Sequence, residues 1–275
     1  KRVGLKVCPK SSPLFQEFKI WQILNNLKVN GIPMDQESKD DLFVELSTKG
    51  KMSSKEILKL LYPRDHKNLQ LNYKDVEGDN TQSELFKAYA KIIEESGNGE
   101  LDFKKQTAYQ LINNVSEIFE GLGWKTDFLY FNSYLDGKEF ENQPLFKLWH
   151  LIYSFEGDNS ISGNEKLKEK ISQLTGIPVE YAKHIANISL TPDYSSLSSK
   201  AIKKILNWMS QGYEYSEACE LAGYRHSKSS LTREEIDAKI YKDKLSLLPK
   251  NSLRNPVVEK ILNQMVNVVN AIIDQ

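Results

Sequence analysis

The residue types that carry out most enzyme chemistry are scattered in this 275-residue sequence. Its four histidines lie far apart, and none has a second histidine or a cysteine at the spacing of metal ligands. The sequence contains no P-loop, no G-x-G-x-x-G motif and no G-x-S-x-G motif. Its two cysteines, Cys8 and Cys219, cannot build a zinc site by themselves. We therefore expect a segment without catalytic residues, without a metal site and without a cofactor of its own.

One group of residues near the N-terminus is suited to binding phosphate and sugar oxygens. Lys19 and Lys28 supply positive charge, and Asn25 and Asn26 supply side-chain amides. An exposed Trp21 would add a surface on which a base or a cation stacks. The alternative is that Trp21 belongs to the core and Lys19 to the solvated face of the same helix.

A second group combines hydroxyl groups with lysines at the start of a predicted helix. The free N–H groups and the positive dipole end of a helix N-terminus attract phosphate. Three lysines follow at i, i+3 and i+4, a spacing that places them on one face of the helix. The residues of this group are Tyr194, Ser196, Ser198, Lys200, Lys203 and Lys204.

A third candidate is the pair Arg254 and Asn255, which directly precedes the last predicted helix. The alternative role of this pair is to cap the entry into that helix. The helix itself, residues 256–273, is apolar nearly all round. Helices of this kind are normally buried on all sides. We infer that it docks on a structure outside this segment.

Apolar periodicity and capping signals predict helices through most of the chain. Residues 191–196 are expected to form a loop. Residues 127–131 are ambiguous, because they suit either a short strand or an aromatic helix. The pattern indicates an all-α fold, an irregular multi-helix bundle with little or no strand. The predicted helices span residues 15–29, 35–46, 53–62, 81–96, 104–120, 145–155, 164–174, 179–188, 198–210, 215–222 and 256–273. Capping boxes are expected for Ser53 with Glu56, for Thr81 with Glu84, and at residues 232–235.

Length and composition bound the organisation of the chain. A chain of this length suits about two domains, and 40% hydrophobic with 27% charged residues is a globular composition. No apolar run approaches the roughly 18 residues of a membrane span, and the start does not resemble a signal peptide. We expect a helical domain over residues 1–190 and a helical segment over residues 191–275, or both packed as one body. Lys1 in place of Met suggests a segment of a longer chain.

The formal net charge is zero, but it is unevenly distributed. Residues 1–74 carry a net charge of +6, residues 75–195 carry −9, and residues 196–275 carry +3. The basic first and last parts can form one positive surface, while the acidic middle part faces elsewhere. The alternative is that these charges only solvate the exposed helix faces.

Four motifs resemble a known family. They are SSPLFQEFKIWQILNNLKV, YSSLSSKAIKKIL, GYEYSEAC and LPKNSLRNPVVEKILNQMVNVVNAI, in this order along the chain. In this combination the sequence resembles the RNA-guided DNA endonuclease of type II CRISPR systems, in particular its compact forms. The resemblance extends from about residue 11 to the end and is loose over residues 65–160.

The resemblance implies a fragment of the α-helical recognition lobe that ends just before the second RuvC-like motif. It implies a non-catalytic module of a cytoplasmic prokaryotic defence enzyme, which binds the guide RNA–target DNA heteroduplex through backbone and shape contacts. Its partners would be guide RNA, target DNA and the RuvC-like and HNH nuclease domains of the parent chain, where Mg²⁺ is expected. Asn25, Asn26 and Lys28 and the second group would lie near the duplex. Arg254 and Asn255 would anchor the approach to the nuclease core.

Two other interpretations remain open at this point. The first is a structural α-helical domain that interacts with a protein partner through its apolar last helix. The second is a hydrolase, which would need a metal or nucleophile constellation that the sequence does not reveal. The acidic residues 75–195 are not expected to contact nucleic acid.

Overall fold

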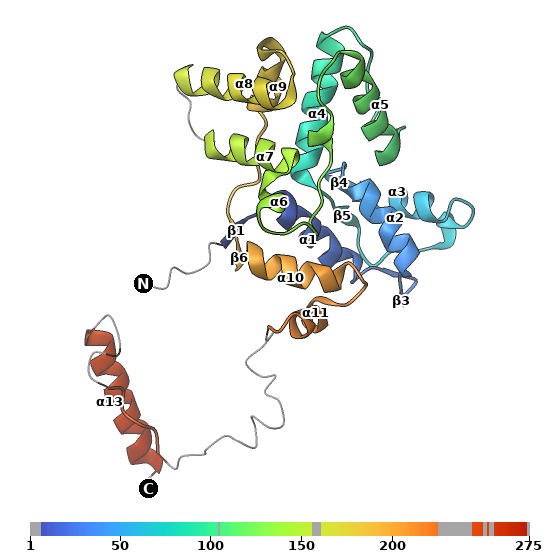
Figure 1. Cartoon of the computed structure of the whole chain (residues 1–275). Helices are drawn as coiled ribbons and strands as arrows, with labels where there is room; N and C mark the ends of the chain where they lie inside the picture. Colours follow the sequence, from blue (N-terminus) through green and yellow to red (C-terminus); the bar gives the residue numbers. More distant parts are fainter. Residues whose placement is uncertain are drawn as a thin grey trace. The chain divides into compact units, whose positions relative to one another are not determined.

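The structure is a computed structural model, and it describes residues 7–103, 105–155, 161–224, 244–249, 252 and 256–273. The chain divides into two compact units, Lys1–Tyr224 and Arg225–Gln275 (Figure 1). Within the described residues the fold is predominantly α-helical, with twelve α-helices and three short antiparallel strand pairs. This confirms the predicted all-α fold class. Helix α10, which lies C-terminal to residue 190, packs against α1 inside the first unit.

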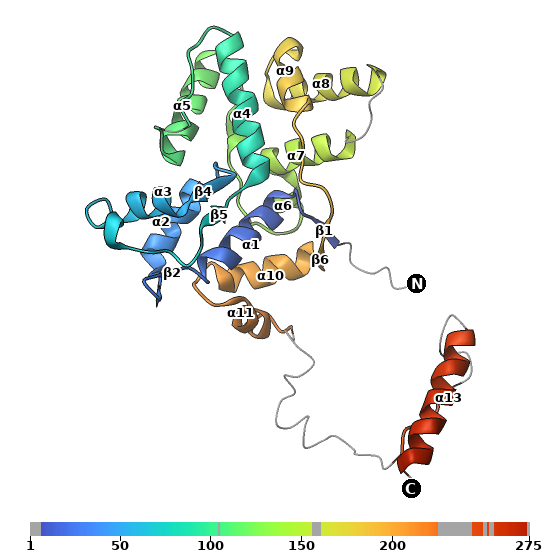
Figure 2. The ribbon, with the colours of Figure 1, turned by 180° about the vertical axis from the view of Figure 1, so that it is seen from behind.

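The first unit contains eleven of the described α-helices and all of the described strands (Figures 1 and 2). The helices are α1 (Pro13–Leu24), α2 (Gln36–Leu46), α3 (Ser54–Leu61), α4 (Asn80–Glu95), α5 (Ala108–Gly121), α6 (Gly137–Asn142), α7 (Pro144–Phe155), α8 (Ile161–Thr175), α9 (Val179–Ala186), α10 (Ser199–Met209) and α11 (Tyr215–Leu221). The strands pair as β1 (Val7–Pro9) with β6 (Tyr194–Ser198), β2 (Lys28–Val29) with β3 (Ile32–Pro33), and β4 (Lys51–Ser53) with β5 (Asp75–Glu77). Two short 3₁₀ helices complete the unit, η1 (His66–Asn68) and η2 (Asp127–Leu129).

Two apolar cores hold this unit together. One lies among α4, α5, α7, α8 and α9 and is centred on buried aromatic residues such as Tyr89 and Phe119. The other lies among α1, α2, α3, α10 and α11. Trp21 belongs to this second core, because it is only 5% exposed and stacks on Phe43 with ring centroids 5.0 Å apart. The interpretation of Trp21 as an exposed, base-stacking residue is therefore wrong, and the alternative is correct for Trp21, whereas Lys19 is half-buried and not on a solvated face.

Three predicted local structures differ from the observed ones. The helix expected over residues 15–29 ends at Leu24, and its last predicted residues form strand β2 instead, which pairs with β3 across the two-residue turn of Asn30 and Gly31, both at positive φ. The loop expected before α10 contains strand β6, which pairs with the N-terminal strand β1. The ambiguous residues 127–131 contain the 3₁₀ helix η2, neither a strand nor an α-helix.

The helix caps explain where several helices begin. The capping box of Ser53 and Glu56 at the start of α3 is confirmed. The expected cap at Thr81 is wrong, because Asp79 caps α4 and the Thr81 hydroxyl donates to the carbonyl of Ser11 at 2.7 Å. Gly78 precedes this cap, and a Cβ there would lie 1.9 Å from the carbonyl oxygen of Lys49. Only glycine fits this close approach.

The second unit is described over residues 244–249, which form no helix or strand, residue 252 and helix α13 (Pro256–Ile273). The helix confirms the last predicted one. Many of its large apolar side chains are exposed in this structure, among them Val257, Ile261 and Met265. The capping box expected at residues 232–235 lies outside the described residues.

Candidate nucleic-acid interface

Strand β6 and helix α10 form the second predicted group. Strand β6 is held at both ends against β1, through the pairs Val7 with Ser198 and Pro9 with Tyr194. Tyr194 is 56% exposed, and its hydroxyl lies 2.5 Å from the hydroxyl of Tyr153 on α7. Ser196 is exposed on the same strand. The strand therefore presents an aromatic ring and a hydroxyl group to solvent.

Ser198 has a structural role at the start of α10. Its hydroxyl oxygen accepts a hydrogen bond from the backbone N–H of Ala201 at 3.2 Å, which makes it the N-cap of the helix. One face of α10 is apolar and buried against the second core. The lysines of the helix therefore lie on the remaining face. The buried residues are Ala201, Ile202, Ile205, Leu206 and Met209.

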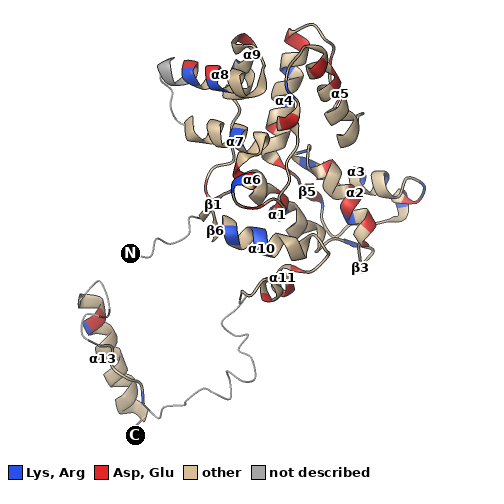
Figure 3. Ribbon diagram, viewed as in Figure 1, with Lys and Arg blue, Asp and Glu red and all other residues tan. Residues whose placement is uncertain are grey.

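The three predicted lysines of α10 line one open groove of about 580 Å³. Figure 3 shows basic residues gathered on α10, whereas α4 and α5 carry several acidic residues. The groove also offers hydroxyl, amide and aromatic groups, which suit the sugars and bases of a nucleic acid. Its lining residues are Ser133, Tyr134, Asp136, Lys200, Lys203, Lys204, Asn207, Trp208, Leu221 and Ala222.

The three lysines are not equivalent. Lys203 is neutralised, because its ammonium group forms an ion pair with Asp136 at 2.5 Å and donates to the carbonyl of Leu135. It also lies over the ring of Phe140, 4.7 Å from the centroid. Lys200 and Lys204 are exposed, and Lys204 lies 6.0 Å from the ring centroid of Tyr224. Lys200 and Lys204 are therefore the groove lysines best placed to meet phosphates.

The first predicted group is separated from the second. Asn25 is 8% exposed, and its amide nitrogen donates to the carbonyls of Met209 and Tyr213, both at 2.8 Å. Asn25 thus contacts the C-terminal end of α10, about 14 Å along the helix from Lys200 at a rise of 1.5 Å per residue. Because its amide is used inside the unit, we leave Asn25 out of the proposed interface. Lys19 is half-buried and pairs with Glu77 at 3.3 Å.

Asn26 and Lys28 remain exposed beside the β2–β3 hairpin. The side chain of Asn72 fixes this edge, since it accepts from the Lys28 N–H and donates to the Asn26 carbonyl, both at 2.8 Å. Val29 forms an antiparallel bridge with Leu71. The hairpin is thereby joined to residues 69–72, which border a further groove.

This further groove, of about 560 Å³, is basic and was not predicted from the sequence. It lies between α3 and η1, and its lining residues include three lysines and a histidine but no aspartate or glutamate. The available signal was the i, i+4 spacing of Lys55 and Lys59 on α3. The lining residues are Ser54, Lys55, Leu58, Lys59, His66, Lys67, Leu69, Gln70 and Leu71. We call this the α3 groove.

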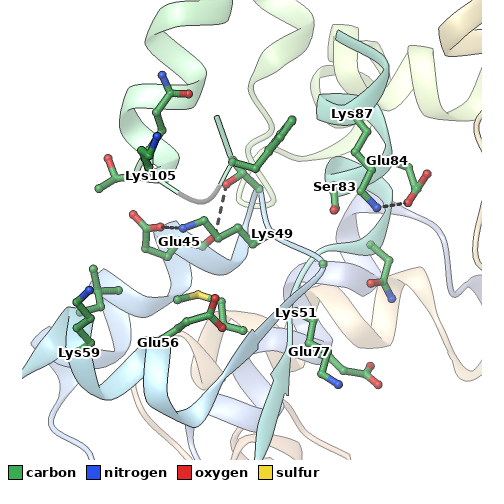
Figure 4. A pocket seen from close by; sticks show the side chains of 18 residues that line it. Glu45, Lys49, Lys51, Glu56, Lys59, Glu77, Ser83, Glu84, Lys87 and Lys105 are labelled. Carbon is green, nitrogen blue, oxygen red and sulfur yellow. Dashed lines mark hydrogen bonds and ion pairs between the residues drawn. The ribbon is translucent and has the colours of Figure 1, made fainter. Parts of the chain in front are cut away.

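A larger cavity, of about 920 Å³, lies among α2, β4, α4 and the start of α5 (Figure 4). Its lysines are largely paired with acids: Lys49 with Glu45 at 2.7 Å and Lys87 with Glu84 at 2.7 Å, for example. Glu45 also accepts from the backbone N–H of Ala108 at 3.0 Å, so it holds the start of α5. The mixed and paired charges do not favour a polyanion here.

Two carboxyl groups of the first unit, those of Glu17 and Asp79, have raised pKa values. Burial raises the pKa of Glu17 to about 8, and the nearby charge of Asp79 adds to this effect. A hydrogen bond from Ser133, which lines the groove on α10, partly offsets it. Burial also raises the pKa of Asp79 to about 7, against the hydrogen bond from the backbone of Gln82 and the charge of Lys19. Two such carboxyl groups link stability to pH.

The described residues contain no group of three or more His, Cys, Asp or Glu side chains that could hold a metal ion. The Mg²⁺ that the sequence resemblance implies for the nuclease domains thus has no ligand set in the described part of this chain. Among the same residues, no helix is long and apolar enough to cross a membrane. Arg254 and Asn255, the third predicted group, lie outside the described residues.

The chain was also compared with known proteins. No protein-family model matches it. Among solved structures it is similar to the crystal structure of the Type II-C Cas9 enzyme from Actinomyces naeslundii, with 13% sequence identity and a TM-score of 0.41. The match covers 97% of this chain and 23% of that chain. The chain therefore spans about a quarter of the length of the enzyme to which it is similar.

Proposed function

We propose that this chain is a non-catalytic segment of an RNA-guided DNA endonuclease that binds a guide RNA–target DNA heteroduplex. The groove on α10 carries the proposal, because it combines two exposed lysines with hydroxyl, amide and aromatic groups. The four sequence motifs support it. The motif YSSLSSKAIKKIL contains β6 and most of α10, and the motif GYEYSEAC contains the turn that follows α10. The endonuclease activity and the RuvC-like and HNH partners belong to the parent protein and are part of the same proposal.

The mode of binding follows from the groups in the groove. Lys200 and Lys204 neutralise phosphates, while the exposed Asn207 offers hydrogen bonds to sugar or phosphate oxygens. Exposed Tyr194 and Tyr134 supply stacking or packing surfaces at the edge of the duplex. These groups read the backbone and the shape of a duplex, not its base sequence. We place Asn26, Lys28 and the α3 groove in the same interface as a second contact to the backbone.

A variant comparison tests the role of the groove. We expect Lys200→Ala with Lys204→Ala to weaken heteroduplex binding on the order of tenfold at moderate salt. The slope of log K against log salt should become shallower by about two, because each lost phosphate contact removes about 0.9. The matched control is Lys91→Ala with Lys147→Ala, two exposed lysines on α4 and α7 outside the groove. Equal losses in both double variants would contradict the proposal, because they would reflect net charge alone.

A second candidate function is docking of a protein partner through α13. It is favoured by the exposure of large apolar side chains along that helix. It predicts self-association that is lost when Val258, Ile261 and Met265 are replaced by polar residues, together with no heteroduplex binding. Sedimentation of the original chain and of this triple variant, each with and without heteroduplex, measures self-association and heteroduplex binding and so separates the two functions.

A further inference from the structure

Two asparagines of α13 hold the main chain of residues 244–249. Leu245 donates its N–H to the side-chain oxygen of Asn270 at 2.8 Å, and the amide nitrogen of Asn270 donates to the Leu245 carbonyl at 2.9 Å. Leu248 and Asn263 form the same pair, at 2.7 and 3.3 Å. Each asparagine amide therefore satisfies both backbone polar groups of a single residue.

The distance between the two hydrogen-bonded pairs is about the same along α13 and along residues 244–249. Asn263 and Asn270 are seven residues apart, which is about 10.5 Å along an α-helix. Leu245 and Leu248 are three residues apart, which is about 10 Å in an extended chain. The numbering rises in one element as it falls in the other, so the segment runs antiparallel to the helix. Two such hydrogen-bonded pairs, which we call rungs, can therefore bind an extended chain without distorting either element.

The four hydrogen bonds are made to peptide groups of the segment. Leu245 and Leu247 are each 53% exposed, whereas Leu248 is half-buried. Both rungs require an N–H donor, so proline is excluded at residues 245 and 248 but is accepted directly after them at Pro249. Recognition of this kind resembles the addition of a strand to a sheet edge, where main-chain hydrogen bonds supply the affinity.

We propose that α13 is a binding site for an extended peptide main chain, with Asn263 and Asn270 as its two rungs. Residues 244–249 are its ligand within the same chain. An extended, leucine-rich segment supplied in trans competes for the same two amides. This site is independent of the proposed nucleic-acid interface, because it uses only residues of the second unit.

Amide hydrogen exchange of the full chain, measured by NMR, tests the rungs directly. We expect the amides of Leu245 and Leu248 to exchange at least tenfold more slowly than in an unstructured peptide of the same sequence. Asn263→Leu and Asn270→Leu should each remove the protection of the paired leucine amide, because a leucine side chain can neither accept from the backbone N–H nor donate to the carbonyl. The matched control is Asn267→Leu, which makes the same change on the same helix outside the two pairs and should preserve protection. Unprotected amides in the original chain would overturn the proposal.

A peptide supplied in trans tests the site as a receptor. Leu245→Pro with Leu248→Pro removes both N–H donors from the resident segment and leaves α13 unchanged. A labelled peptide with the sequence of residues 242–252 should bind this variant at least tenfold more tightly than the original chain. Adding Asn270→Leu should abolish the difference, because leucine can neither accept from nor donate to the peptide main chain. Equal binding to the variant and the original chain would overturn the proposal, provided that circular dichroism shows the same helix content in both.

Discussion

The side-chain amide of Asn25 donates to the backbone carbonyl of Met209 at 2.8 Å, although the two residues are 184 positions apart. A second hydrogen bond, to the carbonyl of Tyr213, uses the other N–H of the same amide. The end of α1 is thereby joined to the end of α10, the helix that carries the groove lysines. The groove therefore depends on packing between α1 and α10, which lie near opposite ends of the first unit in sequence.

We predict that Asn25→Ala destabilises the first unit by about 2 kcal/mol, because two carbonyls lose a buried donor. Asn26→Ala, at an exposed position one residue on, should change stability by less than about 0.5 kcal/mol. Urea unfolding of both variants at neutral pH is the measurement. Equal effects would contradict the role of Asn25 as the link between α1 and α10.

The raised pKa of Glu17 predicts a specific pH dependence. Its folded pKa of about 8 lies above the ordinary value of 4.5, so the folded state binds a proton that the unfolded state has lost. Stability should therefore fall as the pH rises from about 4.5 to 8. Glu17→Gln removes the ionisable group and should raise stability at pH 9 on the order of 2 kcal/mol, with little gain at pH 4.

The raised pKa of Asp79 predicts a pH dependence in the same direction. Because its folded pKa is about 7 and its ordinary value is 3.8, stability should fall as the pH rises from about 3.8 to 7. Asp79→Asn removes the charge and keeps a good helix cap at the start of α4. Thermal unfolding from pH 4 to 9 should show a flatter profile for each variant. Profiles identical to that of the original chain would contradict both assignments.

Asp136 limits the positive charge of the α10 groove. Its side chain is 92% exposed and pairs with Lys203. We predict that Asp136→Asn frees the Lys203 ammonium and raises heteroduplex affinity about threefold, with a steeper salt dependence. Lys203→Ala should have the opposite effect, because it leaves Asp136 as an unpaired negative charge beside the phosphates. Titrations at two salt concentrations measure this, and an unchanged affinity in Asp136→Asn would contradict the role of the pair.

The α3 groove gives an independent prediction. Replacing Lys55, Lys59 and Lys67 together by alanine should weaken heteroduplex binding and make the salt slope shallower by about two to three. The three side chains lie on a short helix and its following turn, so folding should be preserved, and circular dichroism checks this. The control is again Lys91→Ala with Lys147→Ala. A slope that does not change would remove the α3 groove from the proposed interface.

Much of the fold follows from local patterns in the sequence. The apolar period of α10 and the capping box of α3 are visible in a few neighbouring residues, and both are confirmed. The β2–β3 turn was not predicted, although the sequence contains a signal for it, since Asn30–Gly31 is typical of a two-residue hairpin turn. Strand β6 could not be predicted from a local pattern, because its partner β1 lies near the other end of the first unit in sequence.

The candidate site shows the same division. The spacing of Lys200, Lys203 and Lys204 places them on one face, and all three line one groove. The neutralisation of Lys203 by Asp136 joins residues 67 positions apart, so no local pattern reveals it. Asn25 was selected for its amide, but tertiary packing uses that amide inside the unit. Lysines in the sequence therefore predict phosphate-binding residues only weakly, until the structure shows which of them are paired with acidic residues.

Binding of the unmodified chain to duplexes tests the central claim most directly. Fluorescence anisotropy would compare a labelled RNA–DNA heteroduplex of about 20 base pairs with a DNA duplex of the same sequence, at 50 and 200 mM salt. Our account predicts tighter binding to the heteroduplex, whose A-form shape differs from that of B-DNA, and a steep loss of affinity with salt. No heteroduplex binding at 50 mM salt, or equal binding to both duplexes, would contradict it.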